Sequence, residues 1–182
     1  MELFDVFVQG ISIIAMIAMI LSYQCKTQKS ILLMQLVGEV LFALHFLLLK
    51  AYVGCILNVV GILRAGVFYN RKKFHAEHPG WVALFSLLFF GAYVLNFNVF
   101  GADPIVKNFI VELLPVIGMI AATIGMCIGS ARSTRFSFLI CSPSWLIYNC
   151  FSFSIGGIIC EVISLCSIFI GIYRYDIKKK AE

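Results

Sequence analysis

The sequence predicts an all-α membrane protein, with seven transmembrane helices arranged as two parallel three-helix bundles that a linker helix joins. Three observations predict this class. The chain of 182 residues is 62% hydrophobic and only 13% charged, and a soluble core cannot bury so much apolar surface. Apolar segments of membrane-spanning length follow one another with little chain between them. The chain also aligns with itself at a fixed offset.

The apolar segments each reach roughly the 20 residues that a helix needs to cross a bilayer. Their backbones find no hydrogen-bond partners in lipid, so we expect helices rather than open strands. The first follows an acidic start, MELFD, without the basic region or cleavage site of a signal peptide, and we expect it to be retained. The seven expected helices cover approximately residues 3–23, 30–50, 51–70, 80–100, 105–128, 132–152 and 154–174.

Self-comparison divides the chain into three parts. Residues 5–73 align with residues 108–176 without a gap, and 11 of the 69 pairs are identical. Each copy holds three helices, an odd number, so two copies with the same orientation need one more crossing between them. The fourth apolar segment supplies it. We therefore expect a three-helix repeat in 1–73, a linker helix with its flanking loops in 74–103, and a second repeat with a basic cytoplasmic tail in 104–182.

Lysine and arginine predict the orientation. If the N-terminus lies outside, only Lys50 and Lys107 fall in outer loops, and Arg64 falls within a span. Cytoplasmic loops carry an excess of Lys and Arg, so we expect the C-terminus in the cytoplasm and the protein in the bacterial inner membrane. The inner loops and the tail would then hold Lys26, Lys29, Arg71, Lys72, Lys73, Arg132, Arg135, Arg174, Lys178, Lys179 and Lys180.

Polar residues coincide in the two copies, although they are rare in spans. Asn58 aligns with Glu161, each about eight residues into its helix. At about 1.5 Å per residue, both lie about 12 Å below the outer boundary, near mid-membrane. A two-fold axis along the membrane normal would make them face one another, where transporters of this symmetry hold a substrate. Other aligned pairs are Gln9 with Glu112, His45 with Tyr148, and Phe42 with Trp145.

Ionisable residues within spans are costly to insert, so each needs a partner or a water-filled cavity. We expect a structural ion pair between Glu39 and Arg64 in adjacent helices. Glu112 and Glu161 then have no cation left, which suits a proton-coupled or cation-accepting site. The alternative is that they, Asn58 and Gln9 only form hydrogen bonds across helix interfaces.

The stretch CSPSWLIYNC in the sixth apolar segment carries an aromatic group and polar groups. Trp145, followed by Tyr148 and Asn149, could cover a small polar ligand. The alternative is an aromatic belt at the membrane interface. Pro143 in the same segment can kink or hinge the helix.

Motifs for catalysis, cofactors and nucleic acid are absent from the sequence. We therefore expect no enzyme, no cofactor and no nucleic-acid partner. His75 and His78 are more typical of a solvated loop than of a metal site. The seven cysteines form no CxxC pair, which favours packing thiols. The sequence leaves open whether the protein forms a homodimer.

Three stretches, SYQCKTQKS, HFLLLKAYVG and LNVVGILRAGVFYNRKK, resemble the YgjV-type bacterial inner-membrane proteins. That family is similar in architecture to the PQ-loop and SWEET transporters, which double a three-helix bundle around a linker helix. The resemblance implies a SWEET-like fold, with Asn58 and Glu161 in place of the pocket asparagines. Trp145 and Phe42 would stand for the pocket aromatic. One of the two asparagine positions is an acid, and no Pro-Gln dipeptide ends the first or fifth helix.

These observations predict a transporter that moves a small polar metabolite, sugar-like or cationic, by alternating access between the repeats. Its expected partners are the bilayer and that solute, with proton coupling through the acids. Asn58 and Glu161 would contact the substrate, Trp145 would stack on it, and Glu112 would tune the charge. Phe42, Tyr148 and Asn149 complete the candidate site. The alternative is a receptor, a scaffold or a lipid-interacting protein that uses the same fold.

Overall fold

The described part of the protein is all α-helical. The computed structural model describes residues 3–48, 52–99, 105–151 and 155–178. Seven long helices occur in these ranges, each within two residues of the predicted bounds at either end. They are α1 (Leu3–Ser22), α2 (Gln28–Leu48), α3 (Tyr52–Tyr69), α5 (Gly80–Asn98), α6 (Val106–Ile128), α7 (Ala131–Phe151) and α8 (Ile155–Ile172). The predictions for Lys50, Lys179 and Lys180 lie outside the described residues.

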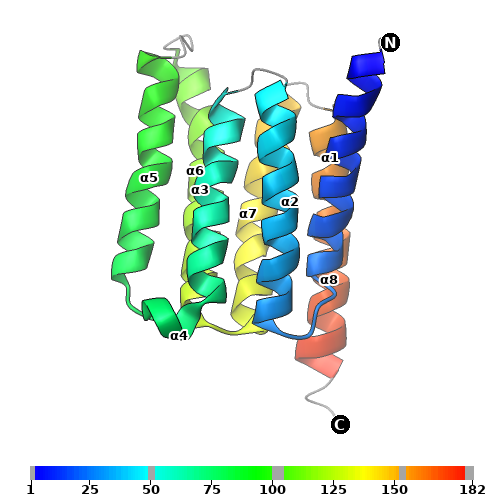
Figure 1. The fold of residues 1–182 in the computed structure, drawn as a ribbon, viewed down its shortest axis with the longest axis vertical. Coiled ribbons are helices and arrows are strands. Elements are labelled where there is room, and N and C mark those ends of the chain that lie inside the picture. Colours follow the sequence, from blue (N-terminus) through cyan, green and yellow to red (C-terminus); the bar gives the residue numbers. More distant parts are fainter. Residues whose placement is uncertain (1–2, 49–51, 100–104, 152–154, 179–182) are drawn as a thin grey trace.

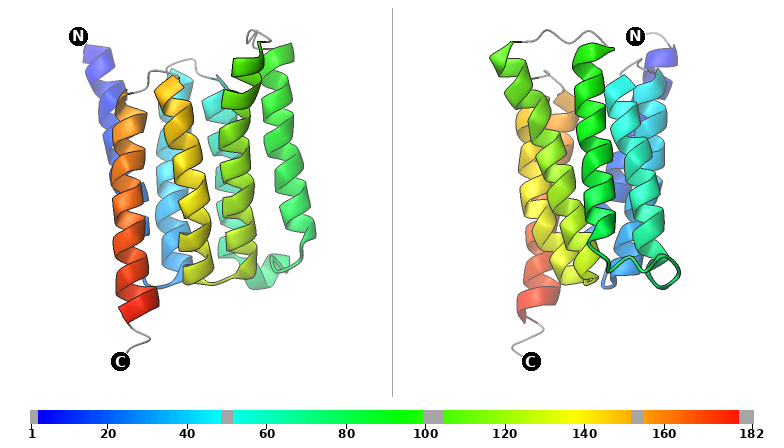
Figure 2. Two further views of the ribbon diagram at one scale, coloured as in Figure 1. Left: turned by 180° about the vertical axis from the view of Figure 1, so that it is seen from behind. Right: turned by 90° about the vertical axis from the view of Figure 1, so that its left-hand side faces the viewer.

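The long helices run nearly parallel to one axis and form two layers (Figure 1). α1, α2 and α3 make the layer in front, and α6, α7 and α8 make the layer behind, with α1 and α8 at the same edge. α5 stands at the opposite edge, where it packs against α3 and α6. The side view separates the two layers and places α5 between them (Figure 2).

Within each layer, consecutive helices alternate in direction. α1, α3, α6 and α8 run away from the end of the molecule where the N-terminus lies, and the C-terminus lies at the other end (Figures 1 and 2). We call these the N-terminal end and the C-terminal end of the molecule. α1 therefore runs parallel to α6, α2 to α7, and α3 to α8.

Two short elements were not expected from the apolar segments. α4 (Arg71–Phe74) follows α3 directly, and a π-helix (Tyr173–Ile177) continues α8 at the C-terminal end. Gly129 ends α6 with a φ of 89°, in the left-handed region that glycine adopts without steric cost. α7 runs through Pro143 without interruption.

Large apolar side chains cover the outer faces of the helices. Leu63, Leu87 and Phe169 are all more than half exposed, a pattern that suits contact with lipid rather than water. By length and composition, three helical stretches could cross a membrane, and they are Gln28–Leu48, Val106–Ile128 and Gly157–Ile177. Phe7–Ser22, Gly54–Tyr69 and Gly80–Leu95 are shorter apolar helices.

Several hydrogen bonds join the two layers on the side of the C-terminal end. Six of those in the described residues reach a backbone carbonyl oxygen. The donor atoms and acceptors are Gln24 Nε2 to Ser167 O (2.7 Å), Gln28 Nε2 to Met126 O (2.8 Å), Ser167 Oγ to Ile20 O (2.8 Å), Arg135 Nη1 to Cys25 O (2.9 Å), Arg64 Nη1 to Met119 O (3.2 Å) and Arg71 Nη1 to Met126 O (3.2 Å). We call these six bonds the carbonyl clamp.

Candidate functional site

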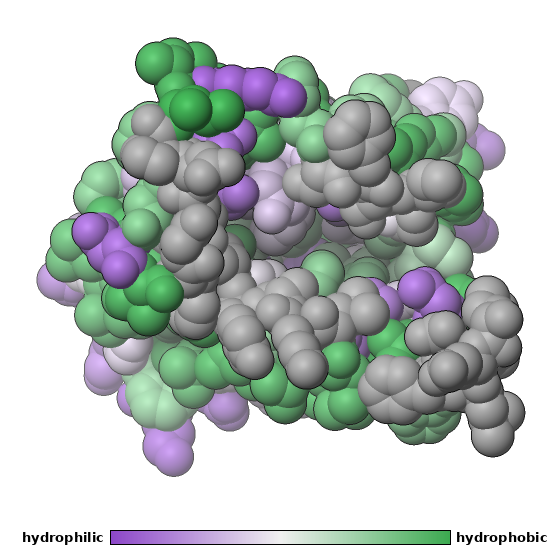
Figure 3. Space-filling view, turned by 90° about the horizontal axis from the view of Figure 1, so that it is seen from above, coloured by the Kyte–Doolittle hydropathy of each residue, from purple (hydrophilic) through white to green (hydrophobic). Residues whose placement is uncertain are grey.

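A cavity of about 860 Å³ lies between the two layers. This volume is in the range of small-molecule binding sites. Seen from the N-terminal end, the surface is hollowed between the two rows of helices, and hydrophilic residues show inside the hollow (Figure 3). All seven residues of the candidate substrate site line the cavity, namely Phe42, Asn58, Glu112, Trp145, Tyr148, Asn149 and Glu161.

Glu161 is held from the neighbouring helix. The hydroxyl group of Ser142 on α7 donates a hydrogen bond to Glu161 Oε2 on α8. Ser142 itself is buried, and both residues line the cavity. The carboxylate of Glu161 is therefore fixed at the cavity wall by a neutral donor.

Asn58 is bonded within its own helix. Its Nδ2 donates to the carbonyl oxygen of Gly54, one turn earlier in α3, at 2.8 Å. Its side-chain oxygen is left as the acceptor that can serve a ligand. Gln9 and Glu112, which align with each other in the two copies, also line the cavity. The structure thus brings the four residues of the predicted polar group to one cavity.

Aromatic rings form two opposite parts of the cavity wall. On α7, Trp145 and Tyr148 meet edge to face, with ring centroids 5.7 Å apart. On α2, Phe42 and Phe46 stack with centroids 6.1 Å apart. Trp145 lies one turn beyond Ser142 on α7, so an aromatic ring and the carboxylate bound to Ser142 adjoin the same space.

Glu39 and Arg64 lie deeper in the cavity. Arg64 Nη2 donates to Glu39 Oε1 at 2.8 Å, and both side chains are almost completely buried. Arg64 also donates through Nη1 to the carbonyl oxygen of Met119, and its guanidinium lies 5.6 Å from the ring centre of Phe89. Among the described residues, Glu39 Oε2 and Arg64 Nε have no hydrogen-bond partner.

The cavity ends toward the C-terminal end at an aromatic contact between the layers. Tyr23, at the end of α1, meets Phe138 of α7 edge to face, with ring centroids 5.4 Å apart. Both rings are buried. The carbonyl clamp lies on the same side of the cavity, so the layers are closed there.

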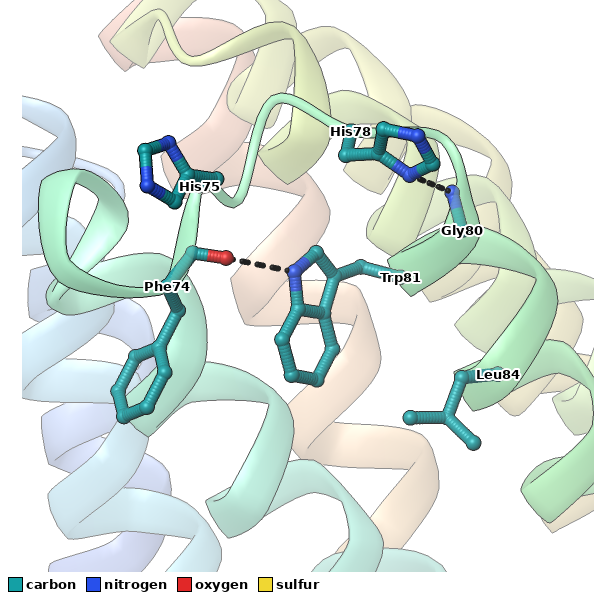
Figure 4. A pocket seen from close by; sticks show the side chains of 6 residues that line it. All are labelled: Phe74, His75, His78, Gly80, Trp81 and Leu84. Atoms are coloured by element: carbon teal, nitrogen blue, oxygen red, sulfur yellow. Dashed lines mark hydrogen bonds between the residues drawn. The ribbon is translucent and has the colours of Figure 1, made fainter.

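A second pocket, of about 350 Å³, lies on the surface at the C-terminal end. Figure 4 shows Trp81 Nε1 donating to the carbonyl oxygen of Phe74 at 2.9 Å, while His78 Nδ1 accepts from the backbone N–H of Gly80 at 3.0 Å. His75 lies apart and is largely exposed. The two histidines therefore do not converge on a common point.

The sequence did not single out Ser142 or Arg135. Ser142 lies in the quoted stretch CSPSWLIYNC, and its spacing of one turn from Trp145 was the signal that could have identified it. Arg135 is counted among the cations of the inner loops and the tail, although it also falls within the expected helix 132–152. In the structure it is buried in α7, where Nε and Nη2 bind both carboxylate oxygens of Asp176, at 2.8 and 2.9 Å.

Comparison with known families decides the class of the protein. The model of the Imp-YgjV family, described as bacterial inner membrane protein, matches residues 6–179. The chain belongs to the Imp-YgjV family. The family resemblance stated from the sequence is thereby confirmed, and a membrane location fits both this Imp-YgjV membership and the apolar helices. The chain has no match among curated proteins or solved structures.

Proposed function

We propose that this Imp-YgjV protein transports a small polar solute by alternating access, with α1–α3 and α6–α8 as two parallel three-helix units and α5 as their linker. The observation that carries the proposal is the cavity between the layers, which is lined by every residue of the candidate substrate site. Transporters built from parallel repeats hold their substrates at the interface between the repeats.

Two close helix contacts support the equivalence of the units. A Cβ at Gly54 would lie 2.9 Å from the ring of Phe46, and a Cβ at Gly157 would lie 2.5 Å from the amide carbon of Asn149. Gly157 aligns with Gly54 and Asn149 aligns with Phe46 at the same offset of 103 residues. Each third helix therefore approaches its second helix at an equivalent point.

The first and second helices of each unit also approach closely at an equivalent point. In one unit the glycine at this point lies on the second helix, and in the other unit it lies on the first helix. A Cβ at Gly38 of α2 would lie 3.3 Å from the carbonyl oxygen of Ala15 on α1. In the other unit, a Cβ at Gly118 of α6 would lie 3.0 Å from Cα of Cys141 on α7. Gly118 aligns with Ala15, and Cys141 aligns with Gly38. One glycine per crossing allows the two backbones to approach.

In this proposal all seven long helices cross the membrane, with the N-terminal end outside. α7 has 21 residues, about the length that a helix needs to cross a membrane. It carries Arg132 and Arg135 in its first turns, and these charges make it less apolar. α6 and α8 lie on either side of α7 in the same layer. They include two of the three stretches that are long and apolar enough to cross a membrane. The closed C-terminal end and the hollow at the N-terminal end then describe an outward-facing state.

Transport requires the two layers to rock about the cavity, which would break the carbonyl clamp and close the hollow. Glu161 and Glu112 can carry protons, and proton coupling through them is part of the proposal. A receptor or scaffold on the same fold would keep one state and would need no access to the cavity from the second side of the membrane.

Cysteine labelling from each side of the membrane tests this function. In a variant without the native cysteines, Asn58→Cys should react with a membrane-impermeant thiol reagent from outside and, more slowly, from inside. Leu63→Cys is the matched control, because it lies on the same helix but is 58% exposed on the outer face and should face lipid. Reaction of Asn58→Cys from one side only would support a receptor, and no reaction from either side would support a packed scaffold.

A further inference from the structure

Negative charge prevails among the residues that line the cavity. Glu39, Glu112 and Glu161 contribute three carboxylates, whereas Arg64 contributes the one guanidinium of the described lining. Arg64 is already bound to Glu39 and to backbone and side-chain acceptors of α6. A solute that enters this space meets acceptors in excess of cations, in surroundings where charge is poorly screened.

A second observation points to a ligand with N–H donors. Glu39 Oε2 has no hydrogen-bond partner among the described residues, the side chain is only 6% exposed, and it lines the cavity. A buried carboxylate oxygen without a donor is costly, and each such group needs an explanation. A donor that enters with the solute would satisfy this oxygen.

The aromatic wall favours the same chemistry. Trp145 and Tyr148 present an edge-to-face pair on α7, next to the Ser142 hydroxyl that fixes Glu161. A cation over the face of an aromatic ring is attracted by its quadrupole, most strongly where water is excluded. Carboxylate and aromatic face together recognise an ammonium group better than a hydroxyl group or an anion.

We propose that the cavity binds an organic cation, a protonated amine whose ammonium group lies between the Glu161 carboxylate and the rings of Trp145 and Tyr148. This assignment rests on the proposed function only in treating the cavity as the substrate site. A polyol would use the amides of Gln9, Asn58 and Asn149 but would bring no cation to the Glu161 carboxylate, whose described donor is a neutral hydroxyl group. An anion would be repelled by the Glu161 carboxylate.

Matched probes that differ mainly in charge test whether the ligand is a cation. Tyramine, tyrosol and 4-hydroxyphenylacetate share one aromatic body and carry an ammonium, a hydroxyl and a carboxylate group. 1,4-Diaminobutane, butane-1,4-diol and succinate repeat the comparison without a ring. The purified full chain in detergent is titrated with each, and dissociation constants are taken from calorimetry or from the rise in melting temperature. We expect the amine to bind at least about tenfold more tightly than its neutral partner in at least one series.

Two variants locate the site. Glu161→Gln should weaken amine binding about tenfold, because it removes a charge-assisted hydrogen bond. Glu77→Gln is the matched control, since it removes one carboxylate that is 58% exposed outside the cavity and should leave amine binding unchanged. If Glu161→Gln fails to fold, the selectivity of the unaltered chain decides the ligand class by itself.

Each result has one meaning. If in neither series the amine binds more tightly than its neutral and anionic partners, the cation assignment is overturned and the transport proposal stands. No saturable binding by any of the six probes also overturns the cation assignment. Amine binding that is equal in Glu161→Gln and in the unaltered chain overturns the placement at Glu161. Amine binding together with labelling of Asn58→Cys from one side only would retain the ligand class and reject transport.

Discussion

The α2–α3 pair and the α7–α8 pair place their acids on different helices of an equivalent framework. In the first, Glu39 lies on the second helix of its unit and binds Arg64 of the third. In the other, Glu161 lies on the third helix and accepts from Ser142 of the second. Ser142 aligns with Glu39, and Glu161 aligns with Asn58.

In our proposal, this difference separates a structural role for Glu39 from a binding role for Glu161. The Glu39 carboxylate is countered by a guanidinium that also holds α6, so this pair links the two layers. The Glu161 carboxylate accepts from a neutral hydroxyl group, and we propose that its charge serves a solute. Under this proposal, the equivalent framework carries a structural ion pair on one side of the cavity and a ligand-binding carboxylate on the other.

Removal of the guanidinium should have the largest effect. Arg64→Met leaves Glu39 buried without its cation, and we expect a loss of about 3–5 kcal/mol in the free energy of unfolding. Glu39→Gln combined with Arg64→Met should recover most of that loss, because no buried charge remains. Unfolding in detergent followed by circular dichroism measures both. A double variant no more stable than Arg64→Met would mean that Arg64 acts through Met119 rather than through Glu39.

Ser142→Ala should cost less. A hydrogen bond to a charged group contributes about 1.5–3 kcal/mol, and here its loss also releases the Glu161 side chain from the cavity wall. We expect both lower stability and weaker amine binding, each measurable on the same purified sample. Ser144→Ala on the same helix is the control, since Ser144 donates to the carbonyl oxygen of Ile140 in its own helix. Equal effects of the two variants would remove Ser142 from the site.

Gly61→Ala tests the packing around the acid of the first pair. The added Cβ would lie 2.8 Å from Glu39 Cδ, so the carboxylate or the helix must shift. Overpacking of this kind costs about 1–3 kcal/mol. The aligned position in α8 is Ser164, and the residue aligned with Glu39 is the smaller Ser142. Ser164→Ala should therefore be milder, and melting temperatures of the two variants compare the units directly.

Asn58→Ala should have the smallest effect on stability. Its one described bond stays within α3, and a neutral hydrogen bond contributes about 0.5–1.5 kcal/mol. Asn58→Asp adds a second acid at the position aligned with Glu161 and should raise amine affinity if the two positions serve the same solute. Unchanged or weaker amine binding, measured by the titration used for the unaltered chain, would show that only α8 carries a recognition position.

The helices and several residues that line the cavity could be predicted from the sequence, but the hydrogen-bond partners of those residues could not. The lengths of the apolar segments predicted the helix ends. The alignment of the two repeats at their rare polar residues identified side chains that line one cavity. The role of Ser142 could not be predicted, because a serine in a membrane span has many potential partners. Only the packing of α7 against α8 shows that its partner is Glu161. The burial of Arg135 was not predicted, because its partner Asp176 lies 41 residues later in the chain and only the structure brings the two side chains together.

The carbonyl clamp has a consequence for how substitutions are tolerated. Every acceptor in it is a main-chain oxygen, supplied by Ile20, Cys25, Met119, Met126 and Ser167. Exchange of an acceptor residue's side chain leaves its oxygen in place, whereas exchange of a donor such as Gln28 or Arg71 removes the bond. A saturation-mutagenesis screen should therefore find these donor positions more restricted than Cys25, an acceptor residue whose side chain is only partly buried. The closed end of the molecule would then be specified by few side chains and could accept wide changes around them.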